Sequence, residues 1–129
     1  MSYGRLNAYQ RVATKADTPA ARLDGIFERV LIECRRAVEY IRTRDIGGKA
    51  RALDRSIELI GELQAALDYT VAPELCRQLN RLYMYVQDRI AYANLRLDPR
   101  AVDEAARILT ELRGAFADAA SAASVGRER

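Results

Sequence analysis

Residues 79–98 read LNRLYMYVQDRIAYANLRLD and combine the apolar spacing of an amphipathic helix with a high density of tyrosine. Apolar residues recur at intervals of three and four, which places them on one stripe of an α-helix, the expected core face. The stripe consists of Leu75, Leu79, Leu82, Val86, Ile90, Ala93 and Leu97. At about 100° per residue, Tyr83 falls on one shoulder of the stripe, and Tyr85 and Tyr92 fall on the other. The apolar arc then covers roughly half the helix, against the ~100° that one buried face needs.

This wide arc has two interpretations. A helix with two neighbours in a bundle needs a wide apolar arc, and tyrosine suits its edges because the ring is buried while the hydroxyl stays in water. Alternatively, the edge forms the wall of a groove for another polypeptide, since tyrosine, methionine and arginine are enriched in interfaces. Asn94 is equally ambiguous, because it suits a surface position near the helix end or an amide directed at a backbone.

Four long helical segments are separated by clear start and stop signals. Asp17-Thr18-Pro19 and Asp98-Pro99 each supply a capping side chain followed by proline, and Pro73 reopens the helical pattern after a break. Gly47-Gly48 is expected to form a tight connection. The expected helices span about residues 19–44, 49–69, 73–97 and 99–120. Short connections make neighbouring helices antiparallel, so we predict an all-α fold, an up-and-down four-helix bundle.

The bundle is expected to form one domain, residues 18–120, with a flexible tail at 121–129, where the sequence is small, polar and unpatterned. Residues 1–17 form a separate N-terminal segment. Leu6 and Tyr9 lie three residues apart in it and are expected to form one apolar turn, helical or extended, that docks on the bundle or on another molecule. Such a short segment does not hold itself as a helix in water.

Composition excludes most catalytic chemistry. The 129 residues include no histidine, which rules out Ser-His and Cys-His nucleophiles and the Glu-x-x-His pairs of di-metal bundles. Cys34 and Cys76 both occupy apolar-stripe positions and are expected to be free thiols in the cytoplasm. The net charge of +3 is spread among interleaved acidic and basic residues, which gives nucleic-acid binding little support. No apolar run approaches the ~20 residues that span a bilayer, and no signal peptide is recognisable. We therefore expect a cytoplasmic binding protein, with no enzymatic activity, metal, cofactor or membrane insertion.

Several short motifs in order resemble the flagellar export chaperone FliS family. Leu82-Tyr83 with Tyr85, then Arg89-Ile90 and the run 93–96, is similar to the family's Leu-Tyr-x-Tyr, Arg-Leu and Ala-Asn pattern. The resemblance covers about residues 6–119. Departures fall mainly in the first helix, where residues 26–29 read IFER in place of the family's Leu-Tyr-Asn/Asp-Gly.

This resemblance implies a cytoplasmic chaperone that binds the C-terminal segment of flagellin in exterior hydrophobic grooves. It prevents premature polymerisation and delivers flagellin to the flagellar type III export gate. The second and third helices are expected to be the groove walls. The expected flagellin-binding residues are Ile57, Ile60, Tyr83, Tyr85, Ile90, Tyr92 and Asn94. The resemblance also implies that Leu6 and Tyr9 cover part of the groove in the free chaperone and dock on an export gate protein. The alternative is a non-enzymatic helical-bundle adaptor or homo-oligomerisation module, with the tyrosine edge as a homodimer interface.

Overall fold

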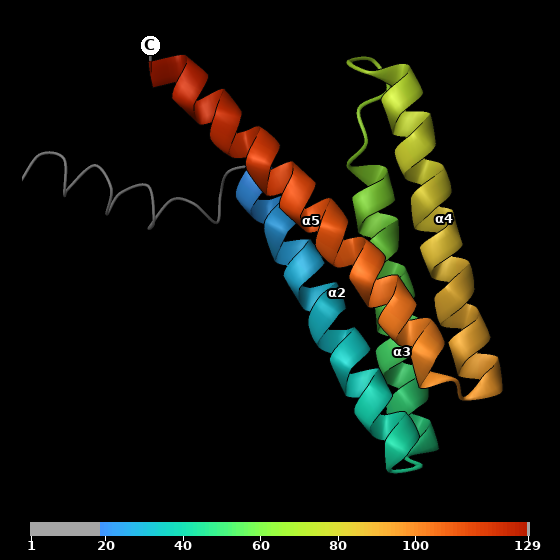
Figure 1. Ribbon diagram of the computed structural model, residues 1–129. Coiled ribbons are helices and arrows are strands. Elements are labelled where there is room, and N and C mark those ends of the chain that lie inside the picture. Colours follow the sequence, from blue (N-terminus) through green and yellow to red (C-terminus); the bar gives the residue numbers. More distant parts are fainter. Residues whose placement is uncertain (1–18, 129) are drawn as a thin grey trace, which may run out of the picture.

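The structure is a computed structural model that describes the backbone of residues 19–128 and the side chains of residues 19–123. It contains four helices: α2 (Pro19–Arg42), α3 (Ile46–Ala65), α4 (Pro73–Arg96) and α5 (Pro99–Glu128) (Figure 1). No strand occurs in this part of the chain, which confirms the all-α prediction. The N-terminal segment 1–17, with Leu6 and Tyr9, lies outside the described residues.

The helices pack in a ring in which each contacts two others. α2 contacts α3 and α5, and α4 contacts α3 and α5. The chain direction alternates from one helix to the next (Figure 1), which confirms the antiparallel four-helix bundle. In the same view, the pair α2 and α5 diverges from the pair α3 and α4 toward the end that carries the α3–α4 connection. The C-terminal half of α5 follows α2, because Phe116 contacts Phe27 with ring centroids 5.8 Å apart and Arg113 pairs with Asp24.

Side chains from all four helices fill the centre of this ring. Phe27 of α2, Leu53 of α3, Ile90 of α4 and Leu109 of α5 have no exposed surface. Each lies on an apolar stripe predicted from the helical spacing. Burial of these stripes supplies the main stabilisation of the bundle, since an isolated helix of this length is marginal in water.

The connection between α2 and α3 differs from the prediction. α2 ends at Arg42, and Arg44 adopts a left-handed conformation with φ of 61°. Asp45 then caps α3 by accepting a hydrogen bond from the Gly48 N–H at 2.9 Å, so Gly47 and Gly48 lie in the first helical turn. A Cβ on Gly48 would lie 2.7 Å from the Tyr40 ring. Glycine is therefore needed at position 48 for close packing and not for a turn.

The helix ends also differ from the expected boundaries. α3 ends at Ala65, four residues before the predicted end at Tyr69, and a turn follows in which Asp68 accepts a hydrogen bond from the Thr70 N–H at 3.0 Å. α5 continues to Glu128, so the backbone of the predicted tail is helical up to that residue. The N-terminus of α5 matches the prediction, since Asp98 accepts a hydrogen bond from the Arg100 N–H at 3.0 Å.

The core face of α4 is rotated relative to the predicted stripe. The buried residues are Cys76, Tyr83, Val86, Ile90 and Ala93. With half-buried Leu79, they recur at strictly alternating intervals of three and four, the spacing of a heptad seam. Leu75 and Leu97, predicted as core, are exposed. Leu97 follows the last helical residue in a left-handed conformation, and Leu75 belongs to the first turn of α4, the end from which α5 diverges (Figure 1).

Candidate functional site: the exposed side of α4

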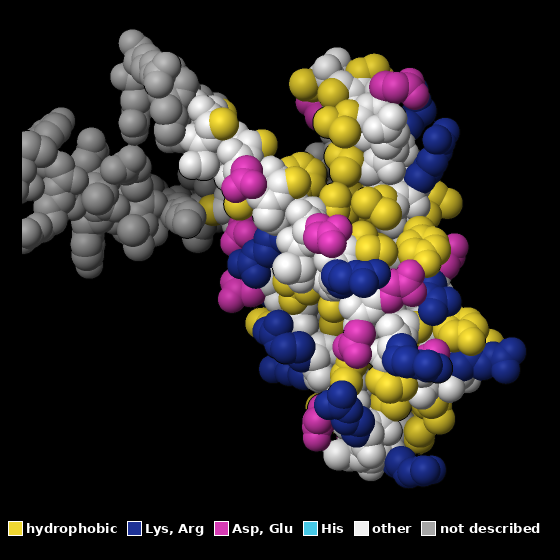
Figure 2. Space-filling view, viewed as in Figure 1, with side chains coloured by type: hydrophobic (Ala, Val, Ile, Leu, Met, Phe, Trp, Pro, Cys, Tyr) yellow, Lys and Arg dark blue, Asp and Glu magenta, His cyan; other side chains and the backbone are white. Residues whose placement is uncertain are grey.

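Exposed apolar side chains are concentrated on α4. Among residues 19–123, nine large hydrophobic side chains are exposed, of which five belong to α4 and one is its C-cap. The α4 group is Leu75, Met84, Tyr85, Tyr92 and Leu95, with Leu97 as the cap. Of the other three, Ile46 is the first residue of α3, and Tyr69 and Val71 lie in the connection between α3 and α4; none lies in α2 or in the described side chains of α5. Figure 2 shows hydrophobic surface extending over the α4 side of the molecule beside α5.

One part of this surface lies between α4 and α5. Leu75, Leu82 and Arg89 are spaced by heptads, so they share one side of α4. That side faces α5, because Arg89 pairs with Glu104 of α5. On α5, Ile108 follows Glu104 by one turn and is half-buried. Half-buried Leu112 follows Ile108 by one more turn. The apolar side chains of the two helices form a strip that is most exposed at Leu75. We call Leu75, Leu82, Ile108 and Leu112 the α4–α5 apolar strip.

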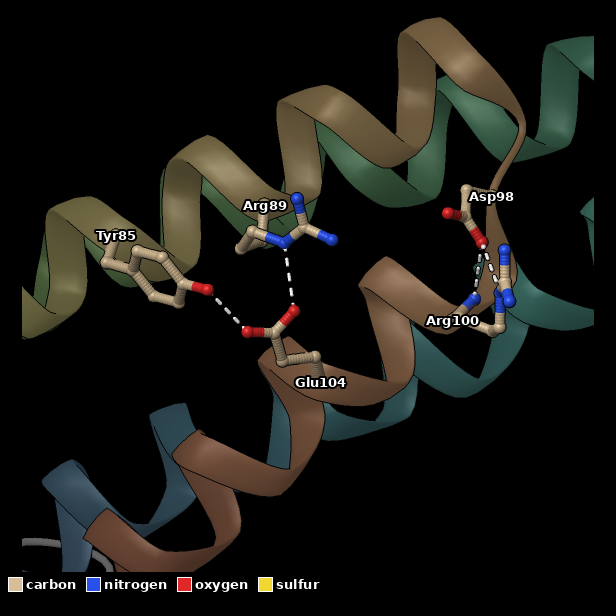
Figure 3. Close-up of polar contacts among 5 residues, drawn as sticks. All are labelled: Tyr85, Arg89, Asp98, Arg100 and Glu104. Atoms are coloured by element: carbon tan, nitrogen blue, oxygen red, sulfur yellow. Dashed lines mark hydrogen bonds and ion pairs between the residues drawn. The ribbon is translucent and has the colours of Figure 1, made fainter.

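A polar cluster, formed by Tyr85, Arg89, Tyr92 and Glu104, borders this strip. The Tyr85 hydroxyl donates to one oxygen of Glu104, and the Arg89 Nε donates to the other at 2.9 Å (Figure 3). The Arg89 guanidinium also lies over the Tyr92 ring, 4.7 Å from its centroid. We call these four residues the Glu104 cluster. It joins α4 to the N-terminal part of α5, before the two helices diverge (Figure 1).

Hydrogen bonding fixes the ionisation of the Glu104 cluster. The hydrogen bond from Tyr85 lowers the pKa of Glu104, and Arg89 lowers it further. The same hydrogen bond raises the pKa of Tyr85. Both shifts favour a neutral Tyr85 hydroxyl that donates to an ionised Glu104.

The other part of the α4 surface lies beside α3 and carries side-chain amides. Gln87 donates to the Gln64 side chain at 3.1 Å and to the Ile57 carbonyl at 3.4 Å, and Gln64 donates to Asn80 at 3.0 Å. These side chains are half-buried, as is that of Ile57. The exposed Met84 and Leu95 lie on α4 beyond them. This side therefore presents amides and apolar groups together.

Asn94 is engaged inside the bundle. The ammonium group of Lys49 donates to the Asn94 side-chain oxygen at 2.7 Å and to the Asn94 carbonyl at 3.0 Å. Lys49 is only 6% exposed. The carbonyl belongs to the last turn of α4, whose C=O groups lack helical partners, so a cation there complements the helix end. Sequence analysis missed Lys49, since its distance of 45 residues from Asn94 gives no local signal.

The seven predicted recognition residues fall in three places. Tyr85 and Tyr92 are 44% and 42% exposed beside α5. Ile57 and Asn94 are half-buried beside α3. The remaining three, Ile60, Tyr83 and Ile90, have no exposed surface. Tyr83 therefore occupies the core and not the shoulder expected from the helical arc, and these three side chains support the surface from beneath.

Two buried titratable groups, Tyr83 and Cys34, lie in the core. Burial raises the pKa of Tyr83 to about 12, and its hydroxyl has no hydrogen-bond partner among the described residues. Burial also raises the pKa of Cys34 to about 11, and neither Cys34 nor Cys76 forms a disulfide. The Cys34 thiol is thus protonated at neutral pH and is a poor nucleophile.

The described residues hold no other recognisable chemical centre. Among the side chains of residues 19–123, no group of three or more His, Cys, Asp or Glu is placed to hold a metal ion. Within residues 19–128, none of the helices has the length and apolar character to cross a membrane.

Comparison with known proteins identifies the family. Residues 2–123 match the family model described as "Flagellar protein FliS". The chain is 28% identical to the flagellar secretion chaperone FliS of Salmonella typhimurium, with 96% of both chains covered. It is 30% identical to the flagellar secretion chaperone FliSB of Pseudomonas aeruginosa, over 86% of this chain and 91% of that protein. The chain therefore belongs to the FliS family of flagellar secretion chaperones.

Proposed function

We propose that this FliS-family chain is a cytoplasmic chaperone for the C-terminal segment of flagellin. The segment binds along α4, beside α5 and beside α3, and is thereby kept from polymerising before it reaches the flagellar type III export gate. The observation that carries this proposal is the concentration of exposed large apolar side chains on α4. Exposed apolar surface concentrated on one element is typical of a protein interaction site.

The energetics favour a partner that covers much of α4. Complete burial of a large apolar side chain stabilises a complex by about 1.5–3 kcal/mol. A segment that is disordered when free loses conformational entropy on binding, which offsets part of this gain. One or two contacts are therefore insufficient, and the segment must cover several of the exposed side chains together. The mechanism is stoichiometric binding, without a catalytic step.

The N-terminal segment completes the proposal. Leu6 and Tyr9 lie outside the described residues, and the family resemblance assigns them two tasks. They cover part of the groove while flagellin is absent, and they contribute to docking on an export gate protein. Replacement of Tyr9 by alanine is then expected to preserve or strengthen flagellin binding while it weakens gate docking.

Fluorescence anisotropy with a labelled peptide of the flagellin C-terminal segment tests the proposed surface. Leu75→Ser replaces an exposed apolar contact on α4 and is expected to weaken binding about tenfold. Ile46→Ser is the matched control, because Ile46 is 53% exposed against 54% for Leu75 but belongs to the first turn of α3. Equal effects of the two substitutions, or no effect of either, would contradict the placement on α4.

The alternative, an adaptor or homo-oligomerisation module, predicts a different experimental result. If the exposed tyrosines of α4 serve a homodimer, light scattering will show a dimer that the flagellin peptide does not dissociate. Under the chaperone proposal, any dimer of the free protein gives way to a complex with one chaperone and one peptide.

A further inference from the structure

The α4–α5 edge changes character along its length. On the side of the Glu104 cluster that faces away from the apolar strip, the exposed groups are mainly arginines. Arg96 follows Arg89 by one heptad on α4, and Arg100 precedes Glu104 by one turn on α5. Arg107 lies on the strip side of Glu104, next to Ile108, and also lowers the pKa of Glu104. The edge thus joins an apolar half to a basic half.

Positive charge exceeds negative charge in the basic half. Of its three arginines, Arg89 pairs with Glu104 and Arg100 pairs with Asp98 at 3.5 Å, whereas Arg96 forms no ion pair with a described residue. One guanidinium charge, that of Arg96, therefore stays without a counter-charge in the basic half. This excess of positive charge attracts an incoming carboxylate, whereas the carboxylate of Glu104 repels it.

Arg89 is the best-placed donor for such a carboxylate. Only its Nε is used by Glu104, and its two terminal nitrogens have no partner among the residues that the structure describes. Figure 3 shows these nitrogens directed away from Glu104. The Tyr92 ring and Glu104 together fix the guanidinium plane. The side chain is 29% exposed, so a ligand reaches it while bulk solvent is partly excluded. A fixed, half-used guanidinium is suited to a carboxylate that binds two nitrogens at once.

We infer that Arg89 receives a carboxylate of the bound segment while the α4–α5 apolar strip receives the apolar part of the same segment. The inference rests on the proposed function and adds a chemical requirement for the partner. Leu82 and Arg89 are seven residues apart, about 10 Å along the helix. The partner's carboxylate therefore lies about seven residues from its apolar anchor if the segment is helical, or about three if it is extended. The carboxylate comes from an Asp or Glu side chain or from the C-terminus of the partner.

Three protein variants test this assignment by peptide anisotropy at low salt. Arg89→Gln removes the charge and is expected to weaken binding about tenfold, the loss of one charge-assisted pair. Arg35→Gln, at an exposed position of α2, which does not contact α4, is the control and is expected to leave binding unchanged. Glu104→Gln releases Arg89 from its internal carboxylate and is expected to tighten binding several-fold. If the cluster serves only to hold α4 against α5, Glu104→Gln is expected to weaken peptide binding, because loss of the Glu104 carboxylate loosens the contact between these helices.

Two altered peptides identify the source of the carboxylate. One carries amides in place of its Asp and Glu side chains, and the other carries a C-terminal amide. One of them is expected to bind the unchanged protein about tenfold more weakly and to be insensitive to Arg89→Gln. The inference is overturned if both altered peptides bind with full affinity, or if the Glu104→Gln variant binds the unaltered peptide more weakly. Both measurements remain possible if the Arg89→Gln variant does not fold. Failure of the unaltered peptide to bind would instead overturn the proposed function.

Discussion

Replacement of Lys49 by methionine tests whether the contact between α3 and the end of α4 stabilises the bundle. Lys49 is almost fully buried, and its ammonium group donates to both oxygens of Asn94. Methionine preserves most of the apolar stem but removes both donors. The Asn94 carbonyl then lies at a helix end without a partner.

The expected loss follows from two opposing contributions. Hydrogen bonds to charged groups contribute about 1.5–3 kcal/mol each, and Lys49 makes two. The variant no longer desolvates a buried ammonium group, which offsets a large part of that sum. We expect a net loss of about 2 kcal/mol in the free energy of unfolding, or about 8 °C in Tm for a domain of this size.

Urea and thermal denaturation followed by circular dichroism measure this change. Arg51→Met is the control, because Arg51 is exposed on the same helix two residues away. A double-mutant cycle with Asn94→Ala is expected to give a coupling of about 1 kcal/mol, since the side-chain oxygen of Asn94 supplies one of the two contacts. Stability of Lys49→Met within about 0.5 kcal/mol of the parent would refute the reasoning.

Three further predictions concern single side chains. Gly48→Ala is expected to destabilise the bundle by about 1–3 kcal/mol, because the new Cβ would lie 2.7 Å from the Tyr40 ring, whereas Gly61→Ala, with no atom within 4 Å, is expected to stabilise α3 by up to about 1 kcal/mol in the same thermal melts. Tyr83→Phe removes a buried hydroxyl without a partner and is expected to leave stability unchanged or raise it by about 1 kcal/mol, so a clear loss would show that the hydroxyl is satisfied. Because the folded state lowers the pKa of Glu104, the carboxylate contributes stability above its unfolded pKa and loses that contribution as pH falls through the folded pKa. The stability difference between the parent and Glu104→Gln should therefore shrink on acidification below pH ~4, and a difference that is constant with pH would contradict this.

The sequence was sufficient to predict the four helices, because their start signals are local. Pro19, Pro73 and Pro99 each begin a helix where the spacing predicts one. The connection at residues 43–45 was misplaced, because glycine is equally compatible with a turn and with close packing. Only the position of the Tyr40 ring shows that Gly48 is needed for close packing.

The rotation of α4 shows the limit of periodicity. A core face that contains Leu75 and Leu82 has nearly the same helical spacing as one that contains Cys76 and Tyr83. Leucine is also the more apolar residue, so the spacing favours the first face. The core nevertheless takes Cys76 and Tyr83, and α5 diverges from α4 toward the N-terminal end of α4 (Figure 1). Such a departure depends on the packing of a third helix, which the local spacing does not encode.

The candidate site was predicted in outline. The excess apolar edge of α4 exists, and Tyr85 and Tyr92 form part of it. The partners of this edge were not predictable, because the pairing of Arg89 with Glu104 depends on the register between two helices. The same holds for Lys49 and Asn94, whose contact crosses from one helix to another.

Calorimetric titration of the flagellin C-terminal peptide into the full chain tests the central proposal most directly. We predict a complex of one chaperone and one peptide, with a negative heat-capacity change on binding because the apolar side chains of α4 leave water. Absence of binding heat at peptide concentrations on the order of tens of micromolar, at two temperatures, would contradict the proposal that α4 is a flagellin-binding surface.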